Sequence, residues 1–178
     1  MGKINPQYHQ TVSQIQNEFE LINKAKNNPE YFEPLYNKYY EQIFRFVHHR
    51  SINVQITKDI VSQIFLKALI NIKTYKNKGV PFSSWLYRIA HNETIQWHRQ
   101  NNNHRAVTLK SDDLVSEINE IDEKDLVIIE LRYFEKRSVI EVSEILNISE
   151  SNAKVRCHRA INRLRSLLLN KIKMYETK

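Results

Sequence analysis

The sequence predicts an all-α protein made of two small helical domains joined by a linker, and three observations support this. Breakers are scarce, since the 178 residues include two glycines and four prolines, and all four prolines lie in the first half. Apolar residues recur at helical spacing, and no segment alternates as a strand does. Net charge is +8 over residues 1–110, −7 over 111–135 and +6 over 136–178. Two basic blocks around an acidic one favour two binding modules with a joint between them.

The first basic block contains four expected helices, over residues 11–26, 29–49, 57–73 and 82–99. Thr57 is the expected N-cap of the third helix. The segment 74–81 contains Gly79 and Pro81, which is typical of a loop. The polar run QNNNHR follows the fourth helix, and residues 101–121 become increasingly acidic. We therefore expect a domain boundary and a linker there.

The C-terminal block contains three shorter expected helices, over residues 123–134, 138–146 and 150–169. Asn147 tolerates a left-handed backbone, and Ser149 can cap the last helix. A short helix, a tight turn and a longer basic helix form the helix-turn-helix pattern. Four basic residues lie off the apolar side of the last helix: Lys154, Arg156, Arg159 and Arg163. These residues predict DNA binding; the alternative is a solvated basic helix.

Two further surfaces are candidates for binding. On the fourth helix four residues align opposite the apolar stripe: Arg88, Asn92, Gln96 and Arg99. With Tyr75, Lys76, Lys78 and Trp97 nearby, they suit single-stranded DNA, although a solvated face is the alternative. On the third helix Leu66 and Ile70 lie opposite the core stripe, beside Asp59, Ser62 and Gln63. That arrangement favours either a protein partner or scattered exposed apolar residues.

Several functional classes are excluded or disfavoured. Two glycines cannot supply a dinucleotide-binding motif or a P-loop. The single cysteine, Cys157, lies on an apolar stripe, and the seven histidines show no metal-ligand spacing. We therefore expect no enzyme activity, no metal, no cofactor and no small-molecule substrate. No apolar run approaches the roughly 18 residues of a membrane span, and the N-terminus lacks a secretory h-region. The expected location is the cytoplasm, without stable membrane insertion.

Four stretches of the chain resemble bacterial RNA polymerase sigma factors of the sigma-70 family, extracytoplasmic-function (ECF) group. They are PEYFEPLYNKYYEQIFRFV (29–47), KDIVSQIFLKAL (58–69), FSSWLYRIAHNETIQWHR (82–99) and IIELRYFEKRSVIEVSEILNISESNAKVRCHRAINRLRSLL (128–168). The resemblance implies an N-terminal extension (1–17), a region 2 four-helix bundle (18–100), an acidic linker (101–119), a region 4 helix-turn-helix (120–170) and a C-terminal tail (171–178).

The resemblance also implies a role for named residues. Core-polymerase contacts fall on Asp59, Gln63, Phe65 and Leu66. Contacts to melted DNA at the −10 element fall on Tyr75, Lys76, Lys78, Arg88, Asn92, Gln96 and Arg99. Contacts to duplex DNA at the −35 element fall on Ser149, Ser151, Asn152, Lys154, Arg156 and Arg159. The chain departs from the family pattern at Ser62-Gln63, where a polar-acidic pair is usual, and at Gln96, where Asp is usual.

The implied function is that of a promoter-specificity subunit. Its implied partners are core RNA polymerase, duplex and melted promoter DNA, and an anti-sigma factor. The alternative is a stand-alone helix-turn-helix regulator without polymerase-core binding, which would not need the surfaces in 58–69 and 75–99. A third hypothesis is a chain that keeps the sigma fold but has lost core binding.

Overall fold

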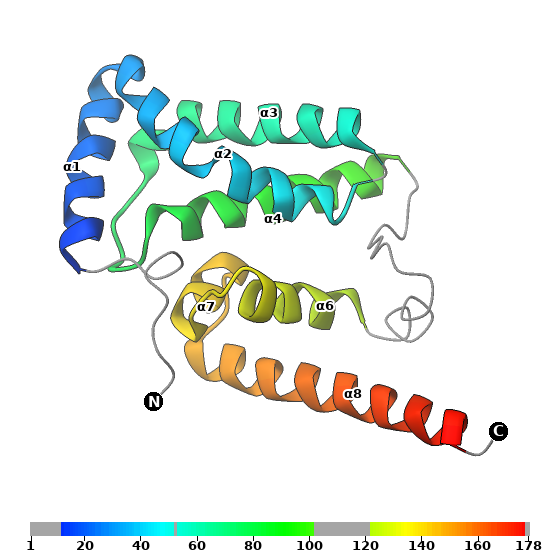
Figure 1. Ribbon diagram of the computed structural model, residues 1–178. Helices are drawn as coiled ribbons and strands as arrows, with labels where there is room; N and C mark the ends of the chain where they lie inside the picture. The colour runs from blue at the N-terminus through cyan, green and yellow to red at the C-terminus, as the bar shows by residue number, and fades with distance from the viewer. Residues whose placement is uncertain (1–11, 52, 102–121, 177–178) are drawn as a thin grey trace. The chain divides into compact units, whose positions relative to one another are not determined.

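The computed structural model describes residues 12–51, 53–101 and 122–176, and every regular element in these ranges is helical (Figure 1). The all-α prediction is therefore confirmed. The chain divides into two compact units. The N-terminal unit contains α1 to α4, and the C-terminal unit contains α6, α8 and most of α7. The expected linker lies outside the described residues from position 102, as do residues 1–11 of the expected N-terminal extension.

The described residues 12–51 and 53–101 of the N-terminal unit form α1 (Val12–Asn27), the 3-10 turn η1 (Pro29–Phe32), α2 (Glu33–His48), α3 (Val54–Asn71), the 3-10 turn η2 (Ile72–Thr74) and α4 (Phe82–Gln100). The expected helix over 29–49 is thus a 3-10 turn followed by α2. Asn28 caps this turn, because its side chain accepts a hydrogen bond from the backbone N–H of Glu30. Pro34 falls in the first turn of α2, where its missing N–H costs no helical hydrogen bond.

Helix α3 begins earlier than expected, and the prediction of Thr57 as its N-cap is wrong. Asn53 is the cap, and its Oδ1 accepts a hydrogen bond from the N–H of Ile56 at 2.9 Å. Thr57 lies one turn inside the helix and is buried. Its hydroxyl donates to the Asn53 carbonyl at 2.8 Å. Asn and Thr are both good N-caps. Asn53 takes this role here because the Thr57 side chain is buried inside the bundle.

The core of the N-terminal unit lies between α2, α3 and α4, which pack against one another. Its largest fully buried side chains include Tyr39, Phe46, Ile64, Leu86 and Tyr87. Burial of each such side chain contributes about 1.5–3 kcal/mol. Helix α1 contacts η1, η2 and α4. This packing fixes the outer faces of α3 and α4, which carry the candidate residues.

The C-terminal unit contains α6 (Glu123–Ile129), the π-helical turn η3 (Glu130–Phe134), most of α7 (Val139–Leu146) and α8 (Glu150–Glu176). Helix α6 packs along α8. The core includes Ile128, Leu131, Val142, Ala153 and Ala160, and each is at most 1% exposed. Helix α8 runs beyond the expected end at residue 169, because neither Gly nor Pro follows in the sequence.

The turn between α7 and α8 has the predicted residues in the predicted roles. Asn147 has a left-handed backbone, with φ of +54°. The N–H of Ile148 donates to the Ser143 carbonyl at 3.0 Å, which closes the end of α7. Ser149 Oγ accepts the N–H of Asn152 at 3.2 Å and so caps α8. This turn fixes the start of the basic helix.

Candidate nucleic-acid and protein interfaces

One outer face of α3 combines polar and apolar side chains. Asp59, Gln63, Leu66 and Ile70 are all exposed there, and Leu66 and Ile70 are 49% and 67% exposed. Their spacings of four, seven and eleven residues keep them on one side of the helix. Gln55 donates a hydrogen bond to the carboxylate of Asp59 at 3.3 Å. This face offers two large apolar side chains within a polar margin, as a protein-binding surface does.

Phe65, the remaining residue expected at this surface, lies in the core. It is 4% exposed, and its ring lies 4.7 Å from the Tyr36 ring and 6.4 Å from the Phe32 ring, measured between centroids. Phe65 therefore supports the α3 surface from inside. The structure brings the other three predicted residues to the surface.

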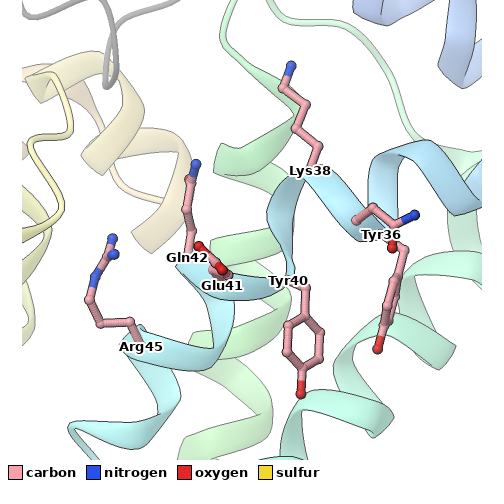
Figure 2. A pocket seen from close by; sticks show the side chains of 7 residues that line it. Tyr36, Lys38, Tyr40, Glu41, Gln42 and Arg45 are labelled. Carbon is pink, nitrogen blue, oxygen red and sulfur yellow. The ribbon is translucent and has the colours of Figure 1, made fainter.

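A row of aromatic rings along α2 was not assigned by sequence reasoning. Tyr36, Tyr40, Phe44 and His48 recur every four residues, with successive ring centroids 5.3, 5.9 and 5.8 Å apart. Figure 2 shows Tyr36 and Tyr40 on the same side of α2. Burial, followed by the neighbouring Tyr40, raises the pKa of Tyr36. The four-residue spacing of these aromatic residues could have indicated the row from the sequence, but the same spacing is equally typical of a helix face that is buried in the core.

A hollow of about 420 Å³ lies along α2, and Figure 2 shows six of its seven lining residues by label. The lining side chains are those of Tyr36, Asn37, Lys38, Tyr40, Glu41, Gln42 and Arg45. All seven come from one helix, so they cannot enclose a small ligand as a binding pocket does. None of them belongs to the predicted sites.

The loop between η2 and α4 presents two of its three predicted residues to solvent. Lys76 and Lys78 are exposed. Between them, Asn77 Oδ1 accepts the N–H of Gly79 at 2.9 Å, and Gly79 has φ of +76°, which suits glycine. The loop therefore holds an ordered turn over residues 77–79, with Lys76 just before it and Lys78 within it.

Tyr75, in contrast, is only 6% exposed. Its ring lies 5.2 Å from that of Phe82 and 5.4 Å from that of Trp85. Burial, followed by the charge of Glu18, raises the pKa of Tyr75 to about 12. Its ring packs at the base of the loop and is not available for stacking on a base.

The predicted residues on α4 share one face. Asn92, Gln96 and Arg99 are exposed, and Arg88 is half-buried one turn before them. Trp85, near the start of α4, is half-buried. It lies seven residues before Asn92, so it belongs to the same face. The structure therefore adds Trp85 to this set as its aromatic member.

The predicted residues of α8 surround its exposed N-terminal turns. Five are exposed: Ser149, Ser151, Asn152, Lys154 and Arg159. Each residue advances about 100° around a helix, so Lys154 and Arg159 lie on opposite flanks of this surface. Val155 lies between these flanks and is 57% exposed. The sequence analysis did not include Val155 in the DNA-binding surface. Its position off the apolar stripe of the helix could have indicated that it is exposed.

Arg156 is half-buried and contacts another helix. Its Nη2 donates a hydrogen bond to the Lys124 carbonyl in the first turn of α6 at 3.1 Å. Next to it, Cys157 is half-buried, and burial raises the pKa of its thiol despite the opposing charges of Arg132 and Arg156. The thiol is therefore protonated at neutral pH.

The described residues also bear on metal and membrane binding. Within residues 12–51, 53–101 and 122–176, no three His, Cys, Asp or Glu side chains are grouped so that they could hold a metal ion. In the same ranges, no helix is both long and apolar enough to span a membrane.

Two family models match the chain in sequence. Sigma-70 region 2 matches residues 35–104, and Sigma-70, region 4 matches residues 118–166. The first match contains α3, the loop and α4, and the second contains the helix-turn-helix. The three predicted surfaces therefore fall inside the two matched regions.

Similar proteins cover most of the chain. RNA polymerase sigma factor YlaC of Bacillus subtilis (strain 168) is 27% identical over 150 residues, which cover 72% of this chain and 86% of YlaC. ECF RNA polymerase sigma factor SigW of the same organism is 27% identical over 172 residues, which cover 80% of this chain and 91% of SigW.

Solved structures show the same fold at lower identity. The structure of CnrH in complex with the cytosolic domain of CnrY gives a TM-score of 0.68 at 23% identity, over 83% of this chain and 94% of CnrH. The structure of RpoE from Bartonella quintana, solved with the anti-sigma factor NepR, gives a TM-score of 0.60 at 21% identity, over 77% of this chain and 96% of RpoE. The two region matches and the named relatives show that the chain belongs to the sigma-70 family of RNA polymerase sigma factors, in its ECF group.

Proposed function

We propose that this protein binds core RNA polymerase and directs it to promoters, where it helps to open the DNA and start transcription. The observation that carries the proposal is the presence of both sigma-70 regions in one chain, over residues 35–104 and 118–166. A regulator that only bound duplex DNA would need the second region alone. The N-terminal region supplies the additional surfaces on α3, the loop and α4.

The polymerase contact is assigned to the exposed face of α3. Leu66 and Ile70 supply apolar area, and Asp59 and Gln63 supply hydrogen-bonding groups beside it. From the family resemblance, we infer that the clamp helices of the largest polymerase subunit bind this face. Ser62 and Gln63 replace the usual polar-acidic pair, which reduces the negative charge of the surface.

The −10 contact is assigned to the loop and to the outer face of α4. Opening a duplex without hydrolysis requires binding energy for unpaired bases, which offsets a cost of about a few kcal/mol per flipped base. Lys76 and Lys78 suit phosphates, and Trp85 suits base stacking. Asn92 and Gln96 present amides that can read base edges. Arg88 and Arg99 supply further positive charge on this face.

The −35 contact is assigned to the first turns of α8, inserted in the major groove. Arg159, Lys154, Asn152 and the serines 149 and 151 suit phosphates and base edges. Val155 offers an apolar contact for a thymine methyl group. Arg156 lies closer to the packed side of the helix, where the Lys124 carbonyl orients it.

The domain limits are proposed as region 2 over residues 18–100, a linker over 101–119 and region 4 over 120–170. Since RNA polymerase acts in the cytoplasm, the proposed location is the cytoplasm. Sigma factors bind and position groups, so no catalytic residue is assigned. An anti-sigma factor stays a prediction of the family resemblance, and co-purification from the source cell tests it.

Run-off transcription with core polymerase and a promoter library tests the proposal. We expect the wild-type protein to select promoters and to produce discrete transcripts. A protein that binds duplex DNA without associating with core polymerase would support the stand-alone regulator. A protein that neither binds core nor starts transcription would support a sigma fold that has lost its partner.

A further inference from the structure

The two ends of loop 75–81 are both bonded to helix α1. At the far end, Glu18 is buried, with 5% exposure, and its Oε2 accepts the backbone N–H of Phe82 at 3.0 Å. Its Oε1 accepts hydrogen bonds from Lys38 Nζ at 2.6 Å and from the Tyr39 hydroxyl. A single carboxylate therefore connects α1, α2 and the start of α4.

The Phe82 N–H needs a partner from outside its helix. Phe82 is the first residue of α4, and the first four N–H groups of a helix have no carbonyl partner within it. Pro81 occupies the N-cap position and provides no side-chain hydrogen bond. Glu18 supplies the missing acceptor, and its negative charge is favourable at a helix N-terminus.

At the near end of the loop, Lys26 Nζ donates a hydrogen bond to the Tyr75 carbonyl at 3.0 Å. The same ammonium lies 5.8 Å from the Phe19 ring centroid and 6.0 Å from that of Tyr75. Lys26 follows Glu18 by eight residues, so both project from a similar side of α1. Figure 1 shows α1 beside the segment that joins α3 to α4.

We propose that α1 positions loop 75–81 for promoter opening, and that Glu18 and Lys26 are the positioning residues. The inference rests on the proposed −10 role of the loop. Between the two fixed ends, exposed Lys76 precedes the Asn77–Gly79 turn and exposed Lys78 lies within it. A loop held at both ends loses less conformational entropy when it binds unpaired DNA. Neither positioning residue needs to touch DNA.

The Lys26 variants provide the decisive test, because this side chain is only half-buried and its loss should leave the fold intact. Lys26→Met keeps the aliphatic chain and removes the donor, and Lys26→Arg restores a donor. Lys24→Met is the matched control, since Lys24 is exposed on the same helix and carries the same charge. Each is assembled with core polymerase and tested on a promoter that the wild-type holoenzyme selects.

Three readouts separate positioning from general damage: core association, binding of duplex −35 DNA, and binding of a fork-junction DNA with a single-stranded −10 strand. We expect Lys26→Met to lower fork-junction affinity at least about threefold, the effect of one hydrogen bond. Core association and −35 binding should stay at wild-type levels. Lys26→Arg should recover most of the loss, and Lys24→Met should show none.

Glu18→Gln provides a second arm, with Glu20→Gln as its exposed control. The amide keeps the size of the side chain but loses the charge, so the same selective loss is expected. Wild-type fork binding by Lys26→Met, or an equal loss in all three readouts, would overturn the inference. If the wild-type holoenzyme selects no promoter, the proposed function itself fails, and this inference falls with it.

Discussion

The guanidinium of Arg156 donates a hydrogen bond to the backbone carbonyl of Lys124, 32 residues earlier, at 3.1 Å. This contact links the helix proposed to bind DNA with the first turn of α6, on which it packs. Arg156 is therefore oriented before DNA arrives, whereas Arg159, three residues later, is exposed. Two arginines on neighbouring parts of one helix surface thus have different surroundings.

Arg156→Ala and Arg159→Ala should each weaken promoter binding several-fold while the helical content stays unchanged. A base-edge contact discriminates between bases by about 1–3 kcal/mol, whereas the loss of a phosphate contact lowers the salt slope by about one. At least one variant should relax preference at a −35 position. Binding measured at several salt concentrations checks this, with Lys173→Ala, which lies past the motif, as the control. Wild-type transcription by both variants would refute the −35 assignment of α8.

Leu66→Asp should weaken association with core polymerase by several kcal/mol, because the contact would bury an unpaired carboxylate. Binding of the isolated protein to −35 DNA should not change. Co-purification with core polymerase measures the effect. Val54→Asp is the matched control, since Val54 is 50% exposed, close to the 49% of Leu66, and lies three turns earlier on α3. Equal co-purification of both variants would show that this face of α3 does not bind the polymerase.

Asn147→Ala should destabilise the helix-turn-helix by about 1 kcal/mol, because alanine lacks the short polar side chain that makes φ of +54° less costly for asparagine than for other residues with a Cβ. Asn147→Gly should be close to neutral, since glycine adopts this conformation without strain. Urea unfolding followed by circular dichroism measures both. A smaller loss for alanine than for glycine would contradict the argument from backbone strain.

Tyr75 should make stability fall in alkaline solution. The pKa of Tyr75 is raised from 10.0 to about 12 in the folded protein, so the fold favours the protonated phenol. Its contribution is fully present below pH 10 and is lost as pH rises from 10 through about 12. Urea unfolding across this range should show a smaller pH-dependent loss in Tyr75→Phe than in the wild type. Tyr31→Phe, at a 46% exposed position, is the control and should follow the wild type.

Limited proteolysis should cut first within residues 101–119 and leave two stable helical fragments. The chain divides into two compact units, and the polar run QNNNHR with the acidic stretch after it separates their sequences. Mass spectrometry of the early fragments locates the cut. A first cut inside α2, α3 or α4 would contradict the proposed domain limits.

The sequence predicted which faces of α3, α4 and α8 are exposed, because helical periodicity depends only on local order along the chain. The same periodicity put Phe65 on the apolar side of its helix, whereas the family resemblance assigned it to polymerase binding, and nothing in the sequence placed Tyr75 inside. Both are aromatic residues whose burial depends on rings from other elements: Tyr36 of α2 for Phe65, and Phe82 and Trp85 of α4 for Tyr75. Residue type alone suits such a ring for either a core or a stacking role.

Glu18 shows a second limit of prediction. A glutamate in an N-terminal helix is expected to be solvated, and nothing near it in sequence indicates burial. Its partners lie 20, 21 and 64 positions away, in α2 and at the start of α4. Only the packed bundle brings these donors together around one carboxylate.

The same carboxylate has a consequence for protein engineering. Transplanting residues 75–81 from a relative into this chain would carry over a new loop but leave its two anchors on α1. A graft whose backbone does not bring the Phe82 N–H to Glu18 and the carbonyl of residue 75 to Lys26 would lose both hydrogen bonds. Chimeras meant to exchange −10 preference should therefore exchange α1 together with the loop, as a pair separated by about fifty residues of unchanged chain.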